Sequence, residues 1–162
     1  NITYLLDMSD MGSINFDYAA TFLDTGYTIA IPGDDKVECA GAYAGPCGLP
    51  APEYNHRFLA TWVTPYDLTV SATWRHIGET DLYGLTDPQG YLEDSMEERN
   101  YLDLAATYDY SENVQVRFGA NNLLGDDAPV TTSSGTGTGN NNTYPGLFDV
   151  STYLFAGVTV KF

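Results

Sequence analysis

Apolar and polar residues alternate along much of the chain with a period of two residues. The alternation is strict over residues 68–75, 102–109 and 114–121, and a shorter run begins at residue 14. Successive side chains of a β-strand point to opposite faces, so each run predicts a strand with one apolar and one polar face. The whole pattern predicts seven strands, near residues 2–8, 13–24, 54–64, 67–78, 100–110, 113–123 and 151–162.

The connections between these strands alternate in length. Short turns are expected near residues 9–12, 64–67 and 111–113, and long loops over 25–53, 79–99 and 124–150. A soluble β-sandwich has no reason to sort its connections in this way, whereas a transmembrane barrel has short periplasmic turns and long external loops. Strands of about ten residues also match the length of a tilted strand that crosses a bilayer. The predicted fold class is therefore all-β, an antiparallel transmembrane β-barrel segment.

The polar face of these strands carries charged residues among small polar neighbours. In a membrane barrel this face lines the lumen and the apolar face meets lipid. Arg75, Arg117 and Asp103 are therefore candidate lumen-facing residues. The two arginines could contact an anionic ligand, or they could pair with Asp103 and other acids of the lumen.

Aromatic side chains are frequent, with 13 Tyr, 7 Phe and 2 Trp. Trp62, Trp74, Tyr108 and Tyr110 are placed to form the aromatic girdles found at the two water–lipid boundaries. The competing role for such residues is stacking on a substrate. Trp74 shares its predicted face with Leu68 and other apolar residues, so we place it toward lipid.

The last strand of the pattern ends on an aromatic residue. Counting back from Phe162, every second residue is apolar: Val160, Val158, Ala156 and Leu154. In a soluble protein such a strand would be an unprotected apolar edge. In outer-membrane barrels a terminal Phe on such a strand resembles the signal read by the barrel assembly machinery. The alternative is a strand that lies at this position by coincidence.

The chain is strongly acidic, with a formal net charge of −16 from 6 basic and 22 acidic residues. Nucleic acid is excluded as a partner, because its binding requires clustered Lys and Arg. The long loops hold most of the acids, including one cluster of Asp34, Asp35 and Glu38 and another within residues 93–98. Carboxylates of this kind could bind Ca²⁺, or they could simply keep the loops solvated. No EF-hand spacing is present, and we expect no metal centre and no cofactor, with Ca²⁺ in the acidic loops as the one alternative.

Cys39 and Cys47 are the two cysteines of the chain, and they lie in a loop rich in Gly and Pro. A metal site usually offers four ligands at tighter spacing, and no His lies near. The spacing favours a local disulfide in an oxidising compartment over two free thiols.

No catalytic constellation is evident, and we expect that the protein is not an enzyme. His56 and His76 lie near opposite ends of their strands, with no convincing nucleophile partner. The Gly-rich stretch 135–139 has no helix after it, so it does not fit a phosphate-binding loop.

Several segments together resemble the C-terminal barrel of TonB-dependent outer-membrane receptors of Gram-negative bacteria. They are residues 52–62, 68–78, 101–104, 119–126 and 143–145, followed by the terminal strand. The resemblance covers nearly the whole chain and rests on the order and spacing of these segments. It implies a barrel of 22 strands filled by an N-terminal plug. It also implies import of a scarce nutrient such as a siderophore, a vitamin or an oligosaccharide, with energy supplied through TonB.

The pattern further predicts that residues 1–162 are the C-terminal part of that barrel. Intact bacterial barrels have an even number of strands, and an open sheet edge is not tolerated in lipid. Seven strands therefore need the remainder of the barrel, and the resemblance adds the plug and TonB as partners. The expected location is the bacterial outer membrane, with the long loops outside the cell and the C-terminus in the periplasm. The alternatives are a passive or structural outer-membrane barrel and a soluble β-sandwich binding module.

Overall fold

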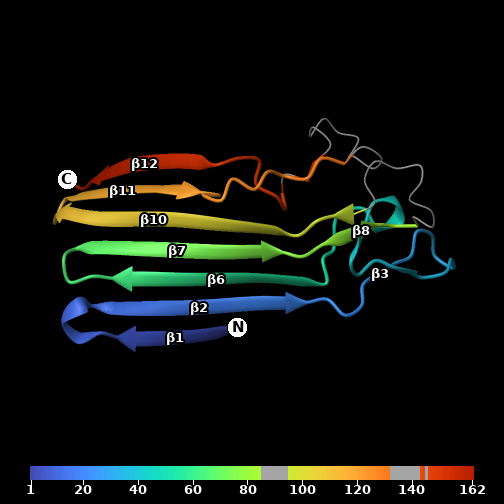
Figure 1. The fold of residues 1–162 in the computed structure, drawn as a ribbon, viewed down its shortest axis with the longest axis horizontal. Coiled ribbons are helices and arrows are strands. Elements are labelled where there is room, and N and C mark those ends of the chain that lie inside the picture. Colours follow the sequence, from blue (N-terminus) through green and yellow to red (C-terminus); the bar gives the residue numbers. More distant parts are fainter. Residues whose placement is uncertain (85–94, 132–142, 145) are drawn as a thin grey trace.

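A computed structural model describes residues 1–84, 95–131, 143–144 and 146–162 of the chain. Its main feature is one antiparallel sheet of seven strands in the order β1-β2-β6-β7-β10-β11-β12, which we call the wall (Figure 1). The strands of the wall are β1 (Ile2–Asp7), β2 (Ser13–Phe22), β6 (Tyr54–Val63), β7 (Leu68–Ile77), β10 (Arg99–Ser111), β11 (Val114–Asn121) and β12 (Tyr153–Val160). All seven strands predicted from the alternation are present, and they pair in chain order. Within the described ranges, no helix is both long and apolar enough to cross a membrane.

The register of the wall collects the apolar residues of all seven strands on one face. Directly paired residues of neighbouring strands share a face, and the register joins Tyr4 to Phe16, Ala60, Ala72 and Leu104 in one continuous row. The apolar face contains Ile2, Leu6, Ile14, Tyr18, Phe22, Phe58, Trp62, Leu68, Val70, Trp74, Leu102, Ala106, Tyr108, Val114, Val116, Phe118, Ala120, Leu154, Ala156, Val158 and Val160. Many large side chains of this face are exposed: Phe22 is 76% exposed and Leu154 is 73% exposed.

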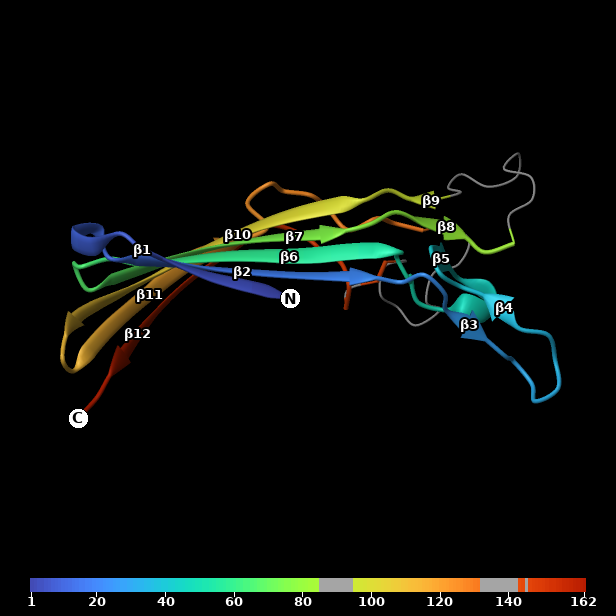
Figure 2. The ribbon, with the colours of Figure 1, turned by 90° about the horizontal axis from the view of Figure 1, so that it is seen from below.

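The opposite face of the wall is polar. It carries Thr69, Ser71, Arg117 and Thr159, as the alternation predicted. Figure 2 shows that the wall is curved, with loop segments on its concave side near the ends of β6, β7 and β10. Those loops pack onto the polar face, because Ile77 and Tyr101 of that face belong to the buried cluster described next.

Buried apolar side chains gather where the long loops meet the wall. The cluster contains Tyr43, Ala44, Ile77, Met96, Tyr101, Tyr144 and Phe148. The wall is a single layer, and so the described residues form a compact core only where loops supply a second layer. This loop end is opposite the short turns, which include the 3₁₀ turn η1 (Ser9–Met11).

The loops contain short elements that the alternation did not predict. β3 (Tyr27–Thr28) pairs with β4 (Val37–Glu38), and a three-stranded sheet joins β5 (Ala42–Tyr43), β8 (Thr80–Leu82) and β9 (Ser95–Met96). A 3₁₀ turn, η2 (Gly45–Cys47), follows β5. β5 and β8 run parallel. The expectation that all neighbouring strands are antiparallel is therefore wrong for this loop sheet, although it holds throughout the wall.

Gly119 of β11 lies where a side chain would not fit. A Cβ atom at this position would stand against the carbonyl oxygen of Leu104 and the ring of Phe155, whereas a Cβ at Gly157 of β12 would meet nothing within 4 Å. Both glycines are on the polar face. We expect Gly119→Ala to reduce the free energy of unfolding by about 1–3 kcal/mol, as other overpacked substitutions do. The matched Gly157→Ala should be close to neutral, and equal urea midpoints for the two variants would contradict the close packing at Gly119.

Candidate functional site

Arg75 of β7 is the centre of a charged network on the polar face. Its Nε donates to Asp103 Oδ2 at 3.0 Å, and its Nη2 donates to Asp103 Oδ1 at 3.3 Å. The same guanidinium donates to both carboxylate oxygens of Asp149, which lies in the loop before β12. It also lies over the ring of Tyr101, 5.0 Å from the centroid. The predicted pairing of Arg75 with Asp103 is confirmed, and Asp149 is a partner that the alternation did not indicate.

Asn122 closes the base of the loop that follows β11. Its backbone N–H donates to Asp103 Oδ1 at 2.8 Å, and its side-chain amide exchanges hydrogen bonds with the backbone of Asp126. Its carbonyl accepts a hydrogen bond from Thr152 Oγ1 at 2.7 Å. Asn122 is fully buried and has a φ of +52°, a conformation that Asn tolerates better than most residues. The sequence signal was an Asn directly after a strand and shortly before Gly and Asp, which is typical of a turn.

Arg117 of β11 behaves differently from Arg75. Its guanidinium carbon lies 5.1 Å from the centroid of the Phe155 ring, and within the described ranges it has no ion pair. The expected pairing with Asp103 or another acid is therefore not found at Arg117. A cation above an aromatic face is attracted by the ring quadrupole, so Phe155 takes the place of a carboxylate partner.

Hydrogen bonds also join polar side chains near the short-turn end of the polar face. Asp17 accepts from Thr3 Oγ1 at 2.8 Å and from Asn15 Nδ2 at 2.6 Å. Gln115 Nε2 donates to Asp109 Oδ1 at 2.7 Å. These contacts pair polar groups of neighbouring residues within the wall itself.

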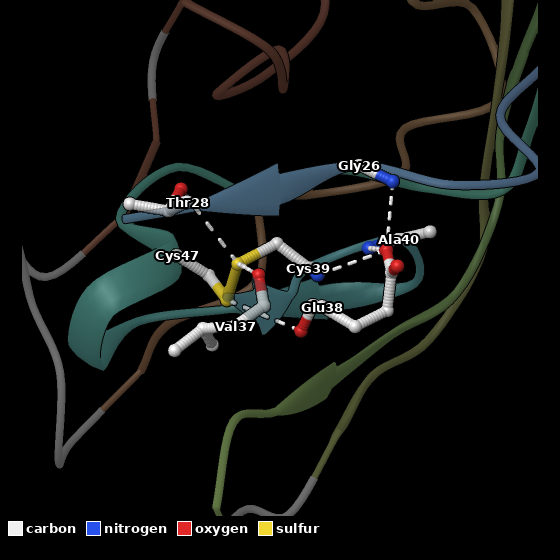
Figure 3. Close-up of a disulfide and its surroundings, with 7 residues drawn as sticks. All are labelled: Gly26, Thr28, Val37, Glu38, Cys39, Ala40 and Cys47. Atoms are coloured by element: carbon white, nitrogen blue, oxygen red, sulfur yellow. Dashed lines mark hydrogen bonds between the residues drawn. A yellow bond between two sulfur atoms is a disulfide. The ribbon is translucent and has the colours of Figure 1, made fainter. Parts of the chain in front are cut away.

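A disulfide joins Cys39 and Cys47, as their spacing predicted, with the two Cα atoms 5.4 Å apart (Figure 3). Beside it, a single oxygen of Glu38 organises the loop. Glu38 Oε1 accepts backbone N–H hydrogen bonds from Gly26 at 2.7 Å, Ala40 at 3.0 Å and Cys39 at 3.1 Å (Figure 3). Hydrogen bonds from Gly26 above all, and from Ala40 and Cys39, hold the pKa of Glu38 below its ordinary value. Glu38 and the disulfide therefore fix the same short stretch of loop.

We expect this loop to loosen in acid because of Glu38. The folded state favours the ionised carboxylate, so its contribution is fully present above the ordinary pKa and is lost as the pH falls through the lower folded pKa. The rate at which a phosphine reduces the disulfide, compared between pH 7 and pH 3, measures this opening. Glu38→Gln keeps an acceptor oxygen but does not titrate, so it should remove the part of the pH dependence that belongs to Glu38. Identical pH dependences in the two proteins would contradict this role.

The cation candidates Asp34 and Asp35 lie between β3 and β4, and Glu38 is in β4. Glu38 uses Oε1 for the loop backbone, and Asp34 lies in a turn in which its N–H donates to the carbonyl of Ile31. A cavity of about 490 Å³ at the loop end is lined by Ala40, Gly41, Glu53, Tyr54, His76, Gly78, Glu79, Asp81 and Glu98. Among the described residues no group of three or more His, Cys, Asp and Glu side chains is arranged to hold a metal ion. Ca²⁺ binding stays a prediction; Glu93 and Asp94 of the second acidic cluster, and the stretch 135–139, lie outside the described residues.

His56 and His76 are cross-strand partners, which the sequence analysis did not recognise. Antiparallel pairing of β6 and β7 brings opposite strand ends together, and the two rings stack with centroids 5.1 Å apart. They lie on the apolar face beside Trp74, whose Nε1 donates to Asn100 Oδ1 at 3.0 Å. No nucleophile accompanies the pair among the hydrogen-bonded residues described, so the arrangement is an aromatic cluster at the loop end of the face.

The remaining girdle candidates lie at the other end of the apolar face. Trp62 Nε1 donates to the carbonyl of Met11 in the turn after β1, at 2.9 Å. Tyr108 shares the apolar face near the turn between β10 and β11, and Tyr110 lies at the bulge between Asp109 and Ser111. Trp62 pairs with Val70, and Trp74 follows four residues later on β7, so the two tryptophans share the apolar face.

The residues of the predicted assembly signal lie on and beyond β12. Leu154, Ala156, Val158 and Val160 share the apolar face. Phe162 lies two residues past the end of the strand and is fully exposed. Recognition by the barrel assembly machinery stays a prediction.

No protein-family model and no curated protein sequence matches the chain. Solved structures of the ferric enterobactin receptor PfeA from Pseudomonas aeruginosa do match it. One point mutant of that receptor has a TM-score of 0.63 at 16% identity, over 99% of this chain and 21% of the receptor chain. A second point mutant, in complex with enterobactin, also has a TM-score of 0.63 at 16% identity, over 99% of this chain and 22% of that chain.

At 16% identity the similarity shows a shared fold and does not show which ligand is bound. The chain spans about a fifth of the length of the receptor that it matches. Over nearly its whole length, therefore, this chain is folded like a segment of a receptor barrel, and its resemblance to TonB-dependent outer-membrane receptors is confirmed at the level of the fold.

Proposed function

We propose that this chain is the C-terminal part of the barrel of an outer-membrane active-transport receptor. Such a receptor imports a scarce nutrient, of the siderophore, vitamin or oligosaccharide class, with energy coupled through TonB. The observation that carries the proposal is the two-faced wall: the register gathers the apolar side chains on one face and the charged network on the other.

The apolar face supports a lipid environment. Soluble monomers rarely expose a contiguous apolar patch larger than a few hundred Å². Here the apolar residues of seven strands are continuous, and no second protein layer covers them among the described residues. A bilayer covers such a face without a second sheet, and Trp62 and Tyr108 lie on it near the short turns, where one boundary with water would be.

The edges of the wall support the remainder of the barrel as a partner. β1 and β12 each have one neighbour in the sheet. In lipid each unpaired backbone N–H or C=O group costs several kcal/mol, so a membrane-spanning sheet must be closed. Further strands that continue the wall on both sides, around a plug, would satisfy these groups and enclose the polar face.

The proposal is tested in the full-length receptor that contains this segment. We expect it in the outer-membrane fraction, with its mobility in gels dependent on heating, and with cysteines introduced in the long loops labelled from outside intact cells. Deletion should reduce growth on a limiting nutrient, and loss of TonB should reproduce that defect. Uptake that does not depend on TonB would indicate a passive barrel, and a stable detergent-free monomer would overturn the membrane assignment.

A further inference from the structure

The segment of residues 146–152 lies across the polar face of the wall. It directly precedes β12, yet Asp149 reaches Arg75 on β7, and β11 and β10 lie between those strands in the sheet. In Figure 1 the loop before β12 passes the end of β11 toward β10, and in Figure 2 it lies on the concave side. In a closed barrel that side is the lumen.

Several contacts hold the segment down. Phe148 is 2% exposed and is packed in the buried cluster with Tyr101, and Leu147 packs against the same cluster. One residue further, Asp149 pairs with Arg75. Val150, which follows, is exposed, and Thr152 Oγ1 donates to the carbonyl of Asn122. The ion pair is therefore the one charged contact between two anchored ends of the segment.

The ion pair is suited to opening and closing. The side chains of Arg75 and Asp149 are 29% and 31% exposed, so water and salt reach the pair and limit its strength. When Asp149 leaves, Arg75 keeps both hydrogen bonds to Asp103, so the guanidinium is not left without a partner. A cavity of about 330 Å³, lined in part by Phe148, Asp149 and Ser151, adjoins the segment and gives it room to move.

The base of the loop is held by Asn122. Asn122 hydrogen-bonds Asp103, Asp126 and Thr152, and its backbone N–H shares Asp103 Oδ1 with Arg75 Nη2. None of these bonds involves Asp149, so opening of the ion pair can free the middle of the segment while Thr152 stays bound to Asn122 and Phe148 stays in the buried cluster.

We propose that residues 146–152 form a latch over the lumen, closed by the Arg75–Asp149 ion pair and opened when that pair breaks. The proposal rests on the receptor function above, since only in a closed barrel does the concave side become a lumen. The closed latch narrows the passage at the loop end, and the open latch clears the wall beside Arg75 for cargo.

Hydrogen exchange of the purified full-length receptor in detergent tests the latch. Asp149→Asn removes the charge with little change of shape, and we expect amide exchange in residues 146–152 to become several-fold faster. Asp127→Asn is the matched control, because it makes the same change in the same loop and the Asp127 carboxylate has no hydrogen bond or ion pair among the described residues. Protection of the β7 and β10 amides in the same data reports that each variant is folded.

Salt provides a second measurement, made first on the wild type. Raising the NaCl concentration should speed exchange of residues 146–152 in the wild type toward the Asp149→Asn rate and leave the variant unchanged, because salt screens a partly exposed pair. The latch would be overturned if exchange of residues 146–152 in the wild type did not respond to salt. It would also be overturned if that exchange were equally fast in Asp149→Asn and Asp127→Asn. These outcomes are separate from the membrane assignment, which a stable detergent-free monomer would overturn.

Discussion

Replacing Val116 with arginine is expected to impair folding in a bilayer, whereas the same replacement at the adjacent Gln115 is expected to be tolerated. Val116 lies on the apolar face between Tyr108 and Val158. A charge on the lipid side costs about 2–4 kcal/mol at the midplane and less toward the boundaries, and Val116, which pairs with Tyr108 near the short turn, lies away from the midplane. Gln115 lies on the polar face and donates to Asp109, and an arginine at that position keeps a donor for the same carboxylate.

The two substitutions share one strand, so local strand propensity is nearly the same for both. The measurement is folding of each full-length variant into lipid vesicles, followed by the shift in gel mobility on heating. A soluble sandwich would also lose stability at Val116, and the wild type in plain buffer is therefore measured in parallel. Equal tolerance of the two variants would show that the apolar face does not meet lipid.

Removing the disulfide is expected to destabilise the loop between β3 and β6 without opening the wall. Closing so short a loop lowers the entropy of the unfolded segment by an amount worth about 2–3 kcal/mol, in a model that treats only chain entropy. The disulfide fixes Cys39, which directly follows Glu38. The Glu38 carboxylate accepts hydrogen bonds from three backbone N–H groups of the same loop. Hydrogen exchange should therefore become faster at Gly26 and Ala40 in a variant with both cysteines replaced by alanine.

The amides of β11 and of the part of β7 away from Ile77 serve as the internal control for that variant, since they hydrogen-bond to neighbouring strands of the wall. Thiol labelling of the denatured, unreduced wild type should detect no reactive cysteine. Stoichiometric labelling would show that the bond is absent, and unchanged exchange at Gly26 in the double variant would show that Glu38 alone holds the loop.

The wall could be predicted from the sequence because its signal is local. A pleated strand repeats every two residues, so the spacing of Val114, Val116 and Phe118 is enough to predict that they share one face. Short turns at residues 9–12, 64–67 and 111–113 then make sequence neighbours pair. The disulfide was also predictable, because Cys39 and Cys47 are close in the chain and have no competing thiol.

The contacts of the loops could not be predicted in the same way. Asp149 is 74 residues from Arg75, and nothing in the spacing of either residue selects the other. His56 and His76 seemed distant because each was placed along its own strand, although antiparallel pairing makes them direct neighbours. The parallel pairing of β5 with β8 likewise joins two loops that have no common periodicity.

The sequence by itself therefore determined the strands, their order and the two faces of the wall, since alternation and turn length are properties of neighbouring residues. Only the tertiary structure decided what the loops do at the end of the wall. Curvature brings loop segments from three connections over the polar face, where Phe148 packs with Tyr101 and Asp149 reaches Arg75. Such contacts depend on how far a long loop folds back, and many loop conformations are compatible with the same local sequence.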